Sequence, residues 1–81
     1  MIKVLIVDDQ AIIRQGLKSL LDTKPDIQVV GDAENGQIAI EQVELLQPNI
    51  VLMDIRMPKM DGVTATQLIC QRFTDVSVSV P

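Results

Sequence analysis

Three aspartates stand at the ends of two apolar runs in this sequence. The chain opens with MIKVLIV and then places Asp8 and Asp9 side by side, and the later run IVLM is followed at once by Asp54. Apolar runs of this length that contain β-branched residues are typical of strands buried on both faces of a parallel sheet. A carboxylate directly after such a buried strand marks a candidate functional site, because packing alone would need only apolar residues.

Three carboxylates a few ångströms apart repel one another in a half-buried site unless a proton or a cation lies between them. Mg²⁺ suits this ligand set, since it prefers oxygen ligands, keeps several waters and commonly uses one or two carboxylates plus a phosphate. One carboxylate would then attack phosphorus and form an aspartyl-phosphate, while the metal neutralises charge on the transferred group. Asp54 is the candidate nucleophile because it stands alone at its strand end, and Asp8 and Asp9 are the candidate metal ligands.

A simpler interpretation stays open for each single aspartate. Carboxylates at strand ends often only solvate a turn or cap the next helix, and Asp9 is a possible N-cap of the helix that follows it. Two separate strands that end in the same way favour the functional interpretation for the group of three. The local pattern places no Lys or Arg in the cleft, although Arg56 and Lys59 belong to the adjoining loop.

Strands and helices must alternate to position these carboxylates. Strand-like apolar runs are predicted at residues 2–7, 27–33 and 50–53, and the final DVSVSVP has the period-2 pattern of a fourth strand. Three helices are predicted between them, because apolar residues recur there at helical spacing. Their expected buried faces consist of Ile13, Leu17, Leu20 and Leu21, then Ala39, Val43 and Leu46, then Ala65, Leu68, Ile69 and Phe73. This alternation predicts an α/β fold with a parallel sheet and right-handed crossovers.

The order of the strands decides whether the aspartates meet. In open parallel sheets, ligand sites lie beyond the carboxyl ends of the strands, where the strand order switches direction. We expect the first strand in the middle, the second on one side and the third on the other, with neighbouring strands ~4.8 Å apart. Asp8, Asp9 and Asp54 would then share one small cleft at the switch point.

Composition limits the classes of function open to this chain. The 81 residues are 47% hydrophobic and 22% charged, which indicates one small globular domain over residues 1–81. A net charge of −4 and a single aromatic residue, Phe73, argue against direct binding of nucleic acid. The lack of His excludes imidazole catalysis, and with a single cysteine, Cys70, it also excludes Cys/His zinc sites. Cys70 itself is interpreted as a small buried hydrophobe on the third helix.

The cellular setting is expected to be the reducing cytoplasm. No apolar run approaches the ~20 residues that cross a bilayer, so no membrane association is expected. The N-terminus enters a strand-like pattern at Ile2 and meets aspartates at Asp8, which is unlike a signal peptide.

The segments VLIVDDQ and VLMDIRMPKMDG together resemble the receiver domain of two-component response regulators. VVGDAENGQIAIE is similar to the second strand and helix of regulators whose receiver precedes a helix-turn-helix DNA-binding domain. The resemblance implies a flavodoxin-like, three-layer fold in which Asp54 is the phosphoacceptor and a histidine kinase is the phosphoryl donor. It also implies a Mg²⁺ site made of Asp8, Asp9, Asp54 and the backbone carbonyl of Arg56, with Asp9 a more direct ligand than Asp8.

The C-terminal part of the chain departs from the family. In the receiver family, the fourth strand ends in a Ser or Thr that hydrogen-bonds the phosphoryl group. The fifth strand of these proteins ends in a Lys that pairs with the same phosphoryl oxygens. Here the fourth strand reads VSVSVP, and neither residue is present. We therefore expect a receiver truncated to about four strands and three helices, with a weakened Mg²⁺ site and slow or absent phosphorylation. We do not expect an enzyme with turnover, because the chain supplies no general base and no phosphate-binding loop.

The fourth strand is expected to form an edge of the sheet. Val76, Val78 and Val80 would lie on one face of that strand, with Ser77 and Ser79 on the other. An uncharged edge invites pairing with a second copy about a two-fold axis, unless the terminus is frayed. The alternative function is therefore a receiver-like interaction module that is not phosphorylated and that dimerises, or titrates a kinase or a full-length regulator.

Overall fold

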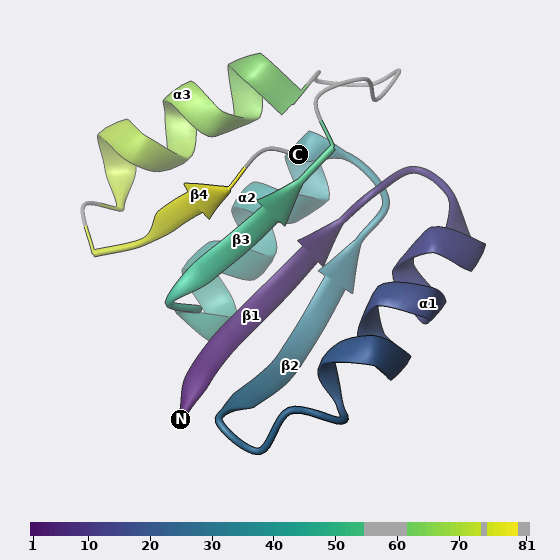
Figure 1. Cartoon of the computed structure of the whole chain (residues 1–81). Helices are drawn as coiled ribbons and strands as arrows, with labels where there is room; N and C mark the ends of the chain where they lie inside the picture. Colours follow the sequence, from purple (N-terminus) through teal and green to yellow (C-terminus); the bar gives the residue numbers. More distant parts are fainter. Residues whose placement is uncertain (55–61, 74, 80–81) are drawn as a thin grey trace.

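Strands and helices alternate along the chain, as the apolar pattern predicts. The computed structural model describes residues 1–54, 62–73 and 75–79 (Figure 1). The elements in chain order are β1 (Ile2–Val7), α1 (Ala11–Leu21), β2 (Ile27–Ala33), α2 (Gly36–Leu46), β3 (Ile50–Met53), α3 (Gly62–Arg72) and β4 (Ser77–Ser79). The predicted bounds of the first three strands agree with the structure.

The four strands form one parallel sheet with the order β2-β1-β3-β4. β1 therefore lies between β2 and β3, which confirms the predicted placement of the first strand. Val7, the last residue of β1, pairs with Ala33 of β2 and with Met53 of β3. The three strands thus end at the same level, so the residues that follow them emerge at one edge of the sheet.

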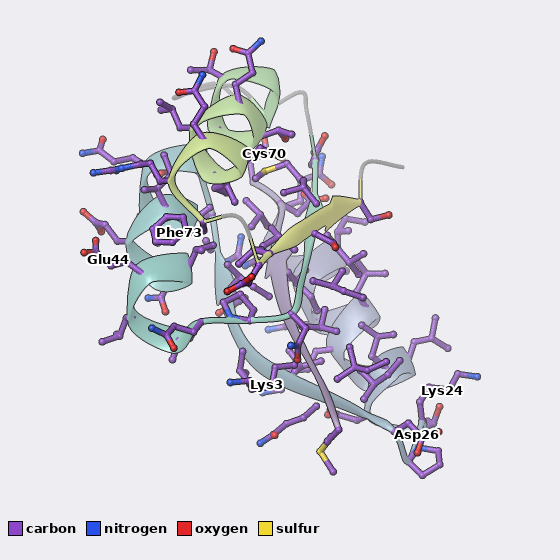
Figure 2. The ribbon with its side chains drawn as sticks, turned by 90° about the vertical axis from the view of Figure 1, so that its left-hand side faces the viewer. Lys3, Lys24, Asp26, Glu44, Cys70 and Phe73 are labelled. Atoms are coloured by element: carbon purple, nitrogen blue, oxygen red, sulfur yellow. The ribbon has the colours of Figure 1, made fainter. Side chains whose placement is uncertain are left out.

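The sheet lies between two helical layers. Figure 2 shows α2 and α3 on one side of the sheet and α1 on the other. The core on the α2 and α3 side is built from alternate strand residues and the apolar faces of those two helices. It includes Leu5, Val7, Val51 and Met53 from the sheet, Ala39 and Val43 from α2, and Ala65 and Ile69 from α3, with Leu46, Leu68 and Phe73 packed around them. The predicted buried faces of the second and third helices are confirmed.

The predicted buried face of the first helix is only partly correct. No residue of α1 is buried: Ile13 is 41% exposed, Leu20 is 59% exposed, and Leu17 and Leu21 are half-buried. Beneath the helix, Ile6 is 1% exposed. In the described part of the chain α1 is the single helix on its face of the sheet. It lies against β1 and β2, while its own flanks remain in contact with solvent.

β4 alternates as the sequence predicts. Ser77 pairs with Ile50 and Ser79 with Leu52, so both serines share the α1 face with these partners, because paired residues of parallel strands point the same way. Val78 packs against the core on the opposite face. Val80, expected to lie on that face too, is outside the described residues.

Cys70 is exposed, so the interpretation of this residue as a buried hydrophobe is wrong. It follows Ile69, which is 0% exposed, and one helical residue turns the side chain by about 100° away from the core. The next residue to pack against the core is Phe73, which is partly buried and comes directly after α3.

Candidate metal centre

The backbone of two neighbouring strands carries Asp8 and Asp54 to the same edge of the sheet. Asp8 follows β1 and donates its amide to the carbonyl of Ala33 at 3.1 Å. Asp54 follows β3 and donates its amide to the carbonyl of Val7 at 2.9 Å. Both residues are therefore held by hydrogen bonds that continue the sheet ladder one step past its last paired residues.

The side chains of Asp8, Asp9 and Asp54 converge. One carboxylate oxygen from each residue lies within 4.8 Å of one from each of the others. Asp8 and Asp54 are half-buried, whereas Asp9 is exposed. The structure thus brings together the three aspartates that the sequence predicts in one cleft.

The three carboxylate groups fit a small, hard cation. In an octahedral Mg²⁺ site with oxygens at about 2.1 Å, ligand atoms lie about 3.0 Å apart when adjacent and about 4.2 Å apart when opposite. The observed separations of up to 4.8 Å need only a small contraction, or a bridging water, to reach that geometry. Three carboxylates also supply the negative charge that offsets the cost of removing water from the ion.

The simpler interpretation as a helix cap fails for Asp9. The N-cap residue of α1 is Gln10, whose side chain makes no capping hydrogen bond. Asp8 does make a local contact, because its Oδ1 accepts a hydrogen bond of 2.9 Å from the amide of Gln10. That contact fixes one oxygen of Asp8 relative to the start of α1.

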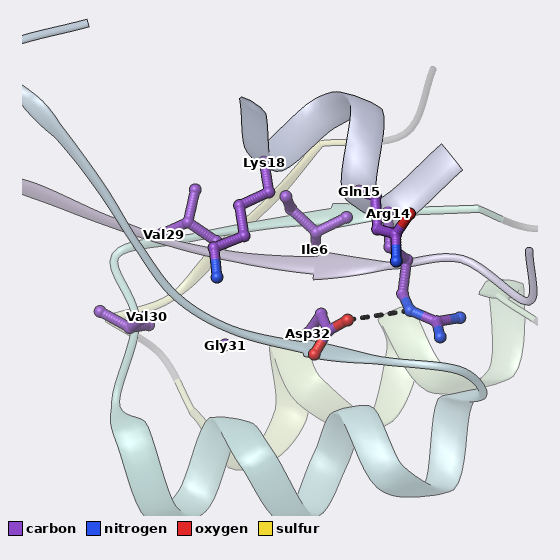
Figure 3. Close-up of a pocket in the computed structure, with 8 residues that line it drawn as sticks. All are labelled: Ile6, Arg14, Gln15, Lys18, Val29, Val30, Gly31 and Asp32. Atoms are coloured by element: carbon purple, nitrogen blue, oxygen red, sulfur yellow. Dashed lines mark hydrogen bonds and ion pairs between the residues drawn. The ribbon is translucent and has the colours of Figure 1, made fainter. Parts of the chain in front are cut away.

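Arg14 reaches the loop that carries Asp8 and Asp9, although the local sequence pattern requires no Lys or Arg there. Its Nη1 donates to the backbone carbonyl oxygen of Asp8 at 2.7 Å, and its Nε donates to Oδ2 of Asp32 at 2.9 Å (Figure 3). Helical spacing predicts Arg14 on the polar side of the first helix. A signal was available in Asp32, a charged residue one position before the end of a strand.

Two predicted features of this site lie outside the described residues. These are the backbone carbonyl of Arg56, expected to complete the metal site, and the adjoining Lys59. Asp61, whose position before Gly62 predicts an N-cap for the third helix, lies there too.

A comparison with known protein families identifies the fold around this site. The response regulator receiver domain matches residues 4–80. The chain belongs to the response regulator receiver family. The match begins inside β1 and extends beyond β4, so it includes every element that carries an aspartate of the cluster.

Individual relatives agree with this assignment. The transcriptional regulatory protein DegU of Brevibacillus brevis is 46% identical over 79 residues, which cover 98% of this chain and 34% of that protein. The transcriptional regulatory protein LnrK of Bacillus subtilis (strain 168) is 50% identical over 78 residues, covering 96% of this chain and 36% of that protein. The crystal structure of the response regulator domain of Thermotoga maritima CheB superimposes with a TM-score of 0.94 at 40% identity, covering 99% of this chain and 59% of that one.

The receiver thus spans about a third of each of these two regulators and about three fifths of that receiver structure. The flavodoxin-like fold and the three-layer arrangement are confirmed by the structural match. None of the helices in the described ranges has both the length and the apolar character to cross a membrane.

Proposed function

We propose that this chain is a phosphoacceptor in two-component signal transduction, in which Asp54 takes a phosphoryl group from a histidine kinase in a Mg²⁺-dependent step. Residues 1–81 act in this proposal as one receiver unit, not as an enzyme with turnover. The convergence of the Asp8, Asp9 and Asp54 carboxylates at the carboxyl ends of β1 and β3 carries the proposal.

Asp54 is the nucleophile in this proposal. Its carboxylate oxygen attacks phosphorus, a new P–O bond forms, and the P–N bond to the kinase histidine breaks, with the electron pair leaving on the imidazole nitrogen. The backbone hydrogen bond from Asp54 to Val7 fixes where the attacking residue leaves the sheet. Asp8, Asp9 and Asp54 would hold the metal, Asp9 more directly than Asp8, and the backbone carbonyl of Arg56 would be the fourth protein group. When bound, Mg²⁺ supplies positive charge that offsets the charge on the transferred phosphoryl oxygens.

The cytoplasm is the proposed compartment. Cys70 is the single cysteine of the 81 residues, so they hold no internal disulfide, as is usual for proteins of reducing compartments.

Intact mass spectrometry after incubation with acetyl phosphate tests this function. We expect the mass of one phosphoryl group to be added in Mg²⁺ and not in EDTA, and we expect none on the Asp54→Asn variant. The matched control is Asp26→Asn, which changes an exposed aspartate next to the start of β2. No addition to a folded wild-type chain, or equal addition to Asp54→Asn, would contradict the proposal.

A second candidate function is an interaction module that is not phosphorylated. The observation that favours it is the position of β4, which pairs with β3 and forms the outer edge of the described sheet. Ser77, Val78 and Ser79 place no charge on that edge, so a second copy would be able to continue the sheet about a two-fold axis. In place of accepting a phosphoryl group, such a module would dimerise, or would bind and titrate a kinase or a full-length regulator.

Sedimentation velocity over a wide concentration range tests the dimer. We expect the wild type to dimerise at high concentration and the Ser79→Lys variant to remain monomeric, because a charged edge resists pairing. Ser19→Lys, on the exposed surface of α1, is the control and should dimerise like the wild type. A folded wild type that stays monomeric throughout would exclude the dimer. Kinase binding that is unchanged in Asp54→Asn would favour titration over phosphoryl transfer.

A further inference from the structure

Arg14, six residues after Asp8, donates a side-chain hydrogen bond to the loop that carries Asp8 and Asp9. The Arg14 side chain is 17% exposed, and it is the least exposed charged group on a helix with no buried residue. Its Nη1 donates to the backbone carbonyl oxygen of Asp8 at 2.7 Å. That carbonyl belongs to the peptide group that joins Asp8 to Asp9, so the contact restrains the plane from which the Asp9 side chain departs.

The other end of the guanidinium is anchored on a different strand. Arg14 Nε donates to Oδ2 of Asp32 near the end of β2 at 2.9 Å, and Figure 3 shows this bond spanning the gap between α1 and β2. The same Asp8 residue is tied to β2 through its amide, which donates to Ala33. Asp8 is therefore held at its amide by the backbone of β2 and at its carbonyl by a side chain that β2 itself orients.

The charges around Arg14 argue that its contact with the loop affects the orientation of the Asp8–Asp9 peptide and not the electrostatic attraction of a cation. Arg14 is paired with the carboxylate of Asp32, and its hydrogen bond to the loop goes to the uncharged backbone carbonyl of Asp8. A positive charge near a cation site repels the cation, so charge alone would make Arg14 unfavourable for Mg²⁺ binding. Any benefit of Arg14 to metal binding must come from the geometry it imposes on the loop.

We infer that Arg14 is a positioning residue for the acidic cluster, which holds the Asp8–Asp9 peptide in the orientation that binds the divalent cation. This inference rests on the proposed Mg²⁺ site. Groups that orient metal ligands from outside the coordination shell typically change metal affinity by about 10–100-fold when they are removed. Because Arg14 acts on a backbone carbonyl, we expect the low end of that range.

The Mg²⁺ affinity of the 81-residue chain, measured by isothermal titration calorimetry, distinguishes two effects of Arg14. One is its orientation of the loop, and the other is the electrostatic repulsion between its charge and the cation. Arg14→Gln loses both donors and should raise the Mg²⁺ dissociation constant about 10-fold, whereas the charge effect alone would lower it. The matched control is Lys18→Gln, one turn further along α1, which removes the same charge. Arg14 and Lys18 line one pocket beside α1 and β2 (Figure 3), and Lys18 makes no hydrogen bond to the loop within the described part of the chain. The dissociation constant of Lys18→Gln should stay at or below that of the wild type. Arg14→Lys keeps the charge but has a single ammonium group for two acceptors, and should fall between wild type and Arg14→Gln.

A second measurement does not involve the metal. In EDTA, the carbonyl ¹³C chemical shift of Asp8 should change in Arg14→Gln and stay constant in Lys18→Gln, because that carbonyl loses its charged donor in the first variant alone. Circular dichroism shows whether each variant is folded, and Arg14→Lys decides the question if Arg14→Gln does not fold.

Mg²⁺ binding by Arg14→Lys that equals the wild type, or an Asp8 shift that does not respond to Arg14→Gln in a folded chain, would overturn the inference. A wild type that binds no Mg²⁺ would instead contradict the proposed function, and the Asp8 shift would still test the position of Arg14.

Discussion

Removing one charge from the acidic cluster should stabilise the chain without metal and weaken its response to metal. Asp9→Asn is the clearest change, because Asp9 is exposed and its side chain makes no hydrogen bond within the described residues. Its carboxylate lies within 4.8 Å of both Asp8 and Asp54. At that distance each like-charge pair costs about 0.9 kcal/mol in water-like surroundings, and salt screening reduces the sum of two pairs to about 1 kcal/mol. In EDTA, the free energy of unfolding of Asp9→Asn should exceed that of wild type by about this amount.

In Mg²⁺, the wild type should become more stable than Asp9→Asn. A ligand that binds the folded state alone stabilises it by about 1.4 kcal/mol at 10 times its dissociation constant and about 2.7 kcal/mol at 100 times. For a domain of this size, 1 kcal/mol corresponds to about 4–8 °C in the melting temperature. The wild type should therefore gain more than 10 °C at the higher Mg²⁺ concentration. Asp9→Asn, which lacks one of the charged ligands, should gain only a small part of that.

Thermal unfolding followed by circular dichroism in EDTA and in Mg²⁺ measures both effects. Asp26→Asn is the matched control, since Asp26 is exposed and its carbonyl accepts from Ile2 at the amino end of β1, far from the cluster (Figure 2). It should leave the Mg²⁺-induced shift unchanged. The reasoning is refuted if Asp9→Asn is less stable than wild type in EDTA and shows the same shift in Mg²⁺.

Three further changes test how the fold positions the site. Ile69→Ala, at a side chain that is 0% exposed, should lower the free energy of unfolding by about 2–5 kcal/mol in urea titrations, whereas Ile12→Ala, at 75% exposure, should change it by less than about 0.5 kcal/mol. Asn35→Ala removes the side chain that accepts from the Ile38 amide at the start of α2, and should cost about 1 kcal/mol, which Asn35→Ser should largely restore. Gln47→Gly should raise the melting temperature through a gain of about 0.5 kcal/mol, because Gln47 has a φ of 50°, a left-handed conformation that glycine adopts without strain.

The arrangement of the cluster could be predicted because it depends on features that a sequence displays directly. Continuous apolar runs indicate strands buried on both faces, and each run ends where its aspartate begins. The strand order needed only the general rule for alternating strands and helices. Once β1 lies between β2 and β3, Asp8 and Asp54 must emerge side by side.

The contacts around the cluster could not be predicted in the same way. Helical spacing places Arg14 on the polar side of α1, but the contact with Asp8 depends on how far that helix sits from the end of β2. The exposure of α1 has a similar origin, because periodicity reports which side of a helix faces the sheet and not how much of it is covered. Cys70 shows the limit of composition, since a small apolar residue next to a buried one lies on the surface.

The identity of the phosphorylated residue tests the central claim most directly. Borohydride reduces an aspartyl-phosphate to homoserine, so treatment after acetyl phosphate and Mg²⁺ marks the acceptor, and tandem mass spectrometry locates it. Cleavage after Arg14 and Arg56 places Asp8 and Asp9 on a different tryptic peptide from Asp54. We predict homoserine at position 54 alone, and only when Mg²⁺ is present. Homoserine at position 8 or 9, or none in a folded chain that has bound Mg²⁺, would contradict the account.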